Sequence, residues 1–236
     1  MTLWVFGDSY VSQSDADIEK FKHNHWIYFL NKELNCSEIE LRGCPGAPNE
    51  WIYYQFYSCL PLIKSDDYVV FVSSQMNRRW FFLDDIGSSN YHISTTAMNN
   101  ISSEEKTALK YYATYLDNPM MSRVFFENMC NSLHYQTIKN NLNLIILPGF
   151  ESGNDGFPIN GKYAVDGNLF YIGMQEIKGK TIEGWQNFIG NTHKGQDPRN
   201  GHLSYENHVI LSKKIANTFL KSETLNLTQG FKEDFL

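Results

Sequence analysis

The sequence lacks the clusters of basic residues that proteins use to bind nucleic acids and anionic membranes. Its 236 residues include 20 lysines and arginines against 26 aspartates and glutamates, which gives a net charge of −6, and both signs are mixed along the chain. Nucleic acids attract Lys and Arg gathered on one face, and an anionic membrane surface attracts the same residues. We therefore expect no nucleic-acid partner and no docking on an anionic membrane.

Long hydrophobic runs are absent as well. No apolar run approaches the roughly 20 residues that a membrane-spanning helix needs. The amino terminus has no basic region, and its apolar run at residues 3–6 is too short for the hydrophobic segment of a secretion signal. The sequence thus predicts no membrane span and synthesis in a cytoplasm without a signal peptide, with export only as part of a larger particle.

Motifs for metals and nucleotides are missing too. Cys36, Cys44, Cys59 and Cys130 show no C-x-x-C spacing, which argues against a zinc site or a thioredoxin-type motif and favours reduced, mostly buried thiols. The sequence contains neither G-x-x-x-x-G-K-[ST] nor, after its first apolar run, G-x-G-x-x-G. These absences weigh against a flavodoxin-like protein that binds a nucleotide or phosphate. Flavin or nucleotide found bound to the purified protein would revive that alternative.

The residues that are present predict an α/β fold. Hydrophobic residues make up 42% of the chain, which is ample for a core. Short apolar runs predict buried strands at 3–6, 39–41, 67–73 and 142–147. Apolar residues at helical spacing predict helices at about 18–34, 51–59, 104–117, 121–140 and 205–220. This alternation is typical of a central parallel sheet with helices on both faces, in which polar residues that follow the strands gather at the carboxyl edge.

The turns after the first two predicted strands carry a family resemblance. Gly7-Asp8-Ser9 follows the first strand and resembles the first block of the SGNH (GDSL-type) hydrolase family. Gly43-Cys44-Pro45-Gly46-Ala47-Pro48 follows the second strand and is similar to the family's second block, in which the later glycine, here Gly46, is the functional one. Taken alone, Asp8 and Ser9 would equally suit a helix cap, because both residue types are common caps.

Two further segments extend the resemblance. Asn77 follows the third predicted strand, 31 residues after Gly46 (77 − 46 = 31), which suits the family's gap between its second and third blocks. His202-Leu203-Ser204 precedes the last predicted helix and is similar to the end of the last block. His208 lies inside that helix, where a packing role is favoured over a catalytic one.

The resemblance implies a fold and its extent. Members of the family have a three-layer α/β/α, flavodoxin-like fold around a central parallel sheet. We expect one such domain over residues 1–222, with insertions at about 80–101 and 151–192, followed by a C-terminal tail at 223–236. The longer insertion is rich in Gly and Asn, and we expect a loop with a small hairpin that selects the substrate.

The resemblance also implies a serine esterase that needs no metal and no organic cofactor. Ser9 would attack an acyl ester, and His202 would act as base and then as acid. The backbone amides of Ser9 and Gly46 and the side-chain amide of Asn77 would form the oxyanion hole. The family's substrates include acetyl groups on polysaccharides and short lipid esters. Because some members are carried by bacteriophages, we also consider a virion-associated deacetylase of host surface glycans.

Two departures from the family pattern affect the site residues. The family's acid usually lies three residues before the histidine, where this chain has Arg199, so Asp197, five residues before His202 (202 − 197 = 5), is the predicted acid. The third block is usually Gly-x-Asn-Asp, and residues 75–78 read Gln-Met-Asn-Arg. Residues 152–155 match that block better, but they follow the fourth predicted strand, so Asn77 is preferred.

These departures leave a second class of function open. A domain of this type that has lost its activity would serve as a binding or structural module, for example in a virion. A Ser9 hydroxyl that does not react with a serine-directed phosphonate would favour that role. Asn77 would then simply be a turn residue, as asparagine often is.

Overall fold

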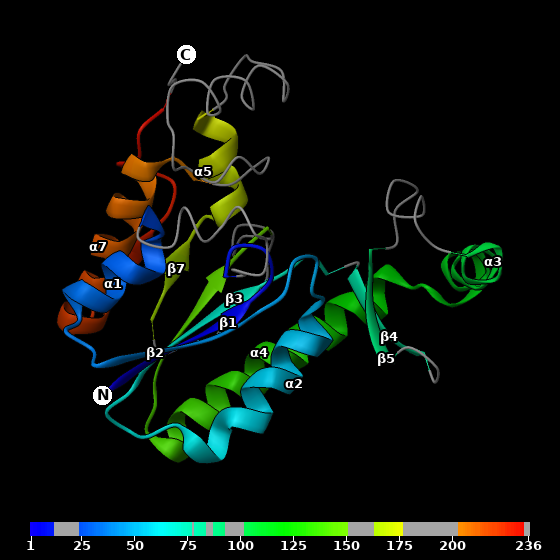
Figure 1. The fold of residues 1–236 in the computed structure, drawn as a ribbon, viewed down its shortest axis with the longest axis horizontal. Coiled ribbons are helices and arrows are strands. Elements are labelled where there is room, and N and C mark those ends of the chain that lie inside the picture. Colours follow the sequence, from blue (N-terminus) through cyan, green and yellow to red (C-terminus); the bar gives the residue numbers. More distant parts are fainter. Residues whose placement is uncertain are drawn as a thin grey trace.

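A sheet of four parallel strands forms the centre of the molecule. The computed structural model describes residues 1–11, 24–76, 78–83, 87–92, 102–150, 163–176 and 203–233. The sheet has the order β2-β1-β3-β6, and all three neighbouring pairs are parallel (Figure 1). Its strands are β1 (Thr2–Gly7), β2 (Glu38–Gly43), β3 (Tyr68–Ser73) and β6 (Asn143–Pro148). The expected α/β fold with a central parallel sheet is confirmed.

Alternation along each strand sends side chains to two hydrophobic cores, one on each face of the sheet. Leu3 and Val5 of β1 belong to one core, and Trp4 and Phe6 belong to the other. Both faces are therefore covered, which is why these strands read as continuous apolar runs in the sequence. Asp67 joins the amino ends of β1 and β3, because its carboxylate accepts from the Thr2 N–H and the Trp4 indole N–H.

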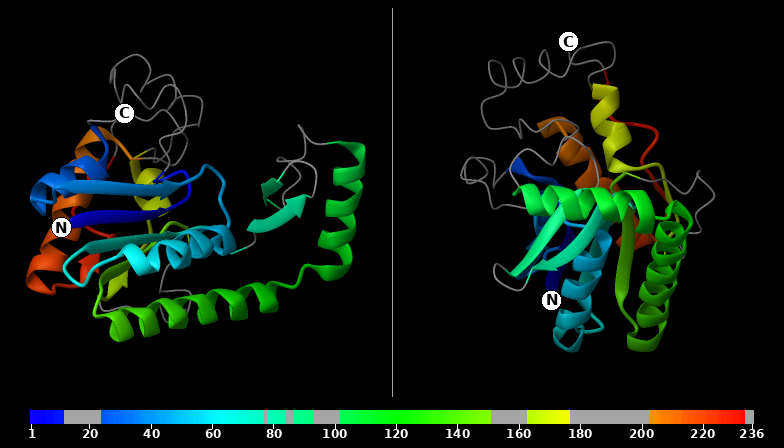
Figure 2. Two further views of the ribbon diagram at one scale, coloured as in Figure 1. Left: turned by 60° about the horizontal axis from the view of Figure 1, so that its bottom comes forward. Right: turned by 90° about the vertical axis from the view of Figure 1, so that its right-hand side faces the viewer.

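Helices cover both faces of the sheet (Figure 2). The core of Leu3 and Val5 includes residues of α1 (Trp26–Glu33), α5 (Leu169–Glu176) and α7 (Tyr205–Lys221), and α1 packs along α7. The opposite core includes residues of α2 (Asn49–Cys59) and α4 (Pro119–Asn140). A short 3₁₀ helix, η3 (Leu60–Leu62), continues α2.

The ends of these helices follow simple rules. Pro119 opens α4, because a proline at the first position removes no hydrogen bond, and the Asn118 side chain caps the Met120 N–H. The predicted helix at 104–117 is divided into α3 (Ser103–Tyr111) and a π-helical turn, η5 (Tyr112–Leu116), before the chain becomes extended ahead of that proline. The first part of the predicted helix at 18–34 lies outside the described residues.

The segment expected as an insertion at about 80–101 forms part of a projecting arm. A hairpin of β4 (Arg78–Leu83) and β5 (Gly87–His92) leads from the end of β3 towards α3. Together with α3 and η5, this hairpin makes up what we call the arm, which extends from one side of the α/β body (Figures 1 and 2). The described residues here contain a regular hairpin where the sequence predicted a loop.

Two further short strands lie in segments that the sequence left unassigned. β7 (Val165–Asp166) comes just before α5 and pairs in parallel with β8 (Leu225–Asn226). Leu225 and Leu227 are each 1% exposed. The chain beyond Ser222, expected as a tail, therefore packs onto the body at this point. Residues 151–162 and 177–192 of the longer predicted insertion lie outside the described residues.

Candidate active site

The sheet order brings the loops after three strands to one edge. β1 lies between β2 and β3, so the chain winds one way from β1 to β2 and the other way to β3. In open α/β sheets, ligands bind outside the carboxyl ends of the strands at such a reversal. Ser9 comes two residues after the end of β1 and is half-buried at this point.

Close packing explains the glycine in the Gly7-Asp8-Ser9 turn. A Cβ added to Gly7 would lie 2.5 Å from Val11 Cγ2 and 2.9 Å from Val72 Cβ. Both distances are far shorter than ordinary van der Waals contacts, so only glycine fits. The turn closes with a hydrogen bond of 3.0 Å from the Val11 N–H to the Asp8 carbonyl. The position of Ser9 is thus fixed by packing against β3.

Asp8, the residue before Ser9, forms a buried ion pair. Its carboxylate is fully buried and accepts from Arg78 Nη1 at 2.7 Å and from Ser74 Oγ at 3.0 Å. The Tyr10 N–H donates to its other oxygen at 3.2 Å. The Arg78 guanidinium also lies 4.9 Å from the Phe150 ring centre, which is a cation–π distance. A buried carboxylate needs such partners, and here they join the ends of β1 and β3.

The loop after β2 lies along the same edge. The Cys44 N–H donates to the Gly7 carbonyl at 3.3 Å, so the loop remains joined to β1 beyond the last strand pair. Gly46 has a φ of +72°, which is a left-handed conformation that favours glycine, and an Ala47 N–H to Cys44 carbonyl bond of 3.0 Å closes the turn. The structure therefore brings Ser9 and the Gly46 loop to adjacent strand ends.

The end of β3 is held by the first residue of α2. Asn49 Nδ2 donates to the Ser74 carbonyl at 2.9 Å, and the Ser74 N–H donates to Asn49 Oδ1 at 2.8 Å. Asn49 is 3% exposed, so this two-bond clamp fixes the backbone three residues before Asn77. Asn77 itself lies outside the described residues, as does the competing segment 152–155. The structure therefore leaves the choice between Asn77 and Asn154 untested.

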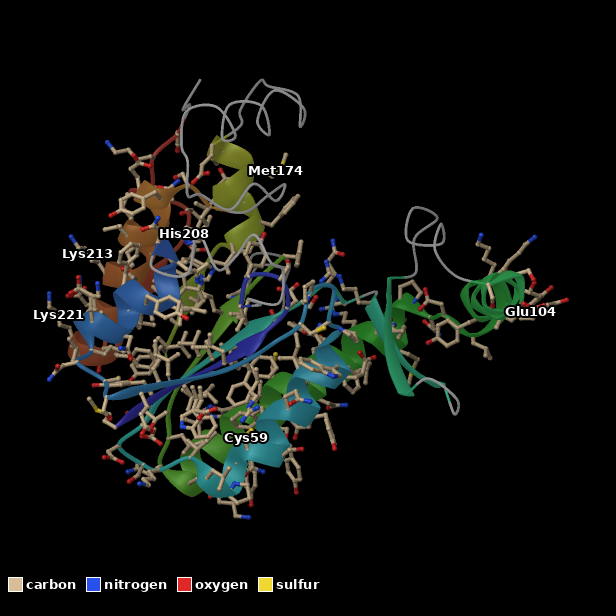
Figure 3. All side chains as sticks on the ribbon, viewed as in Figure 1. Cys59, Glu104, Met174, His208, Lys213 and Lys221 are labelled. Atoms are coloured by element: carbon tan, nitrogen blue, oxygen red, sulfur yellow. The ribbon has the colours of Figure 1, made fainter. Side chains whose placement is uncertain are left out.

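Contacts between α1 and α7 place the start of α7 at this edge. The Trp26 indole N–H donates to the Tyr10 carbonyl at 3.1 Å, which joins the Ser9 turn to the first residue of α1. The neighbouring His25 ring lies 4.7 Å from that of His208, in the first part of α7 (Figure 3). His208 is 4% exposed, in agreement with the packing role expected for it.

A buried glutamate anchors the segment that leads into α7. Glu176, the last residue of α5, accepts from the Ser204 N–H at 2.9 Å, from Ser204 Oγ at 2.9 Å and, through a very short bond, from Asn207 Nδ2. Burial raises the pKa of Glu176 to about 7, the three donors offset part of that effect, and the charge of Glu206 adds to it. Ser204 lies two residues after His202, which is itself outside the described residues, as is Asp197.

Sequence patterns had given no sign of several residues that shape this edge, namely Asn49, Ser74, Arg78 and Glu176. Each acts through a side chain that bonds to a part of the chain far away in sequence, with separations of 25 residues for Asn49 and Ser74 and 28 for Glu176 and Ser204. The only available signal was local: asparagine is a common first residue of a helix.

In the described ranges, no three His, Cys, Asp or Glu side chains lie close enough to share a metal ion. Cys36, Cys59 and Cys130 are buried free thiols and Cys44 is a partly exposed one, as the sequence predicted. None of the helices in the described part of the chain has the length and hydrophobicity to cross a bilayer.

The candidate site combines a serine after the first strand of a parallel sheet, a glycine loop after the adjacent strand, and a clamp after the third. No model of a known protein family matches the chain, and no curated protein matches it significantly in sequence.

Proposed function

We propose that this chain is a serine esterase of the SGNH type, which hydrolyses an acyl ester, such as an acetyl group on a carbohydrate, through an acyl-enzyme on Ser9. The strand order β2-β1-β3 carries the proposal. It supports the proposal because Ser9, the Gly46 loop and the clamped end of β3 follow three adjacent parallel strands, whose carboxyl ends meet at one edge. The start of α7 at that edge supports a role for the preceding His202.

The proposed reaction has two halves. Ser9 Oγ attacks the acyl carbonyl while His202 takes its proton, and His202 then gives that proton to the leaving alcohol. Water attacks the acyl-enzyme with the same histidine as base, which releases the acid and restores Ser9. Asp197 is proposed to orient His202. The N–H groups of Ser9 and Gly46 and the Asn77 amide are proposed to stabilise the oxyanion.

The electrostatics next to Ser9 favour this chemistry. A bare carboxylate one residue from the nucleophile would oppose the negative charge that develops on the substrate oxygen. The Asp8 carboxylate instead forms an ion pair of 2.7 Å with Arg78, whose side chain is 11% exposed. The pair cancels the charge of Asp8 close to Ser9, so the N–H donors at this edge act on the oxyanion without an opposing field.

Hydrolysis of p-nitrophenyl acetate tests the proposal. Ser9→Ala should abolish acyl-enzyme formation because it removes the nucleophile, and His202→Ala should lower the rate by several orders of magnitude because the serine then lacks its base. Asn77→Ala should lower kcat about 10²–10³-fold, which is the usual effect of removing one oxyanion donor. Ser37→Ala is the matched control, because the Ser37 hydroxyl is exposed and bonds the Met1 carbonyl at the opposite edge of the sheet.

Each result has a defined meaning once circular dichroism shows that the variants fold. Full activity in folded Ser9→Ala would refute the proposed nucleophile. An inactive wild type whose Ser9 also fails to react with a fluorophosphonate probe would refute the proposed esterase. It would favour a domain that serves for binding or structure. Arg199 supports that alternative, because it occupies the position of the family's acid. Labelling of Ser9 that disappears in His202→Ala would support the serine–histidine pair even if the natural ester is unknown.

A further inference from the structure

The helix of the arm, α3, has no buried side chain among those that the structure describes. Its nine residues extend from Ser103 to Tyr111, and it packs chiefly against η5, which directly follows it. Its exposed side chains are Ser103, Glu104, Lys106, Thr107, Ala108, Lys110 and Tyr111. Helices shorter than about 12–15 residues are marginal in water without packing. A helix this short and this exposed is expected to be stabilised by contacts from another molecule.

Large apolar side chains are exposed at the end of α3, in η5 and at the start of α4. Tyr111 is 62% exposed, Tyr115 73% and Leu116 69%, and Met120 and Met121 continue the surface. The rings of Tyr111 and Tyr115 are stacked with centres 5.9 Å apart. An apolar surface of this kind, with charged residues beside it, is typical of a protein–protein interface.

The charged residues of α3 in one copy of the chain complement those of α3 in a second copy that lies antiparallel to it. Glu104 and Lys110 each lie three residues from Thr107 (107 − 104 = 3; 110 − 107 = 3), and both are exposed. Two copies of α3 that cross antiparallel at Thr107 therefore bring Glu104 of each copy opposite Lys110 of the other. Two shallow grooves along the helix are both lined by Thr107 and Tyr111, so the crossing point is also where a partner helix can approach.

We propose that the arm is a dimerisation element and that its partner is a second copy of this chain, with the two α3 helices antiparallel about a two-fold axis at Thr107 (Figure 3 shows Glu104 at the outer end of the arm). A two-fold interface places the same patch on both subunits and requires each patch to complement itself. The symmetric placement of Glu104 and Lys110 about Thr107 meets that requirement. The proposal is independent of the activity proposed for Ser9.

Charge-swapped variants of the full chain test the pairing, with mass measured by light scattering after gel filtration. The wild type should elute as a dimer. Glu104→Lys and Lys110→Glu should each raise the dimer dissociation constant at least tenfold, because each places like charges together at both ends of the crossing. An equimolar mixture of the two variants should form a heterodimer, since both positions then carry lysine in one chain and glutamate in the other. Lys106→Glu is the matched control, because its symmetry mate is the uncharged Ala108, and it should remain a dimer.

Three results would overturn the proposal: a monomeric wild type at every concentration, single variants as dimeric as the wild type, or a mixture that stays monomeric.

A second measurement does not depend on charge. Thr107→Cys, in a Cys44→Ser background, should form a disulfide between copies, because residues on the axis of close-packed helices come within disulfide range. Lys213→Cys, on the exposed face of α7, is the control for random collision and should remain uncrosslinked.

Discussion

The α/β body and the arm are held together in opposite ways. In the body, the central residues of β1, β3 and β6 are buried, and each face of the sheet has its own hydrophobic core. In the arm, every described side chain of α3 is exposed. The body is therefore stabilised by apolar burial, the largest favourable term in folding, whereas the described side chains of α3 contribute little to it.

Arg79 of β4 makes polar contacts both within the arm and from the arm to the body. Arg79 Nε donates to Tyr112 Oη at 3.2 Å, and its guanidinium lies 3.4 Å from Asp117 and 3.8 Å from Glu50 of α2. Arg79 also forms a very short bond with Ser122 Oγ in α4. Elements with few buried apolar contacts open at lower free energy than the core, so the arm is expected to open before the body unfolds.

Two adjacent phenylalanines of α4 give the largest expected difference in stability loss between a core position and a surface position. Phe126 is 1% exposed and belongs to the core shared with α2, whereas Phe125 is 39% exposed. Phe126→Ala should lower the free energy of unfolding by about 3–5 kcal/mol, through lost burial and the cavity that remains. Phe125→Ala should lower it by less than about 1 kcal/mol. Urea denaturation measures both, and equal losses would contradict the separation between core and surface.

Two adjacent arginines give the next comparison. Arg78→Met removes the cation that neutralises the fully buried Asp8, so unfolding should become easier by about 3 kcal/mol. Arg79→Met removes ion pairs whose members are 13–27% exposed and should cost about 1 kcal/mol. In Arg79→Met, hydrogen exchange should accelerate in α3 and remain unchanged in β3.

A double variant controls for the charge left behind. Asp8→Asn combined with Arg78→Met should recover most of the stability lost in the single arginine variant, because no unpaired charge remains in the site. If the double variant is as unstable as Arg78→Met, the ion pair is not the cause of the loss, and packing of the arginine on Phe150 would have to explain it.

The difference between body and arm also explains what the sequence could predict. The strands of the body read clearly, because burial on both faces requires uninterrupted apolar runs such as those at 68–73 and 143–148. The hairpin of the arm was expected as a loop, since residues 80–82 form a run of aromatic residues without the alternation that marks a half-buried strand. The helix α5 was missed because it is short and contains Gly173.

For the candidate site, local spacing revealed Ser9 and Gly46 but not the residues that hold them. The Asp8–Arg78 pair spans 70 residues of sequence, and no periodic pattern encodes such a contact. The hydrogen bonds of Asn49 to Ser74 could not be predicted either, because an asparagine at the start of a helix is usually interpreted as a cap. Motifs thus indicate candidate reacting groups, and the side chains around them emerge only when the fold brings distant segments together.

The last of the expected effects concerns Glu176, whose stability contribution depends on pH. Its folded pKa of about 7 lies above its ordinary value of 4.5, so the folded protein holds this proton more tightly than the unfolded chain does. The resulting stabilisation is complete below about pH 4.5 and is lost as the pH rises to about 7. At about 1.36 kcal/mol per pKa unit, the loss is at most about 3 kcal/mol.

Glu176→Gln isolates this effect, because glutamine cannot ionise and its oxygen can still accept from Ser204 and Asn207. Between pH 5 and pH 8 the wild type should lose up to about 3 kcal/mol relative to the variant, measured as the difference in free energy of unfolding at each pH. Glu127→Gln, at an ion pair on the surface of α4, is the control and should show no such divergence. A constant difference between wild type and Glu176→Gln would mean that the carboxyl group is already ionised at pH 5. In that case its three hydrogen-bond donors would outweigh its burial.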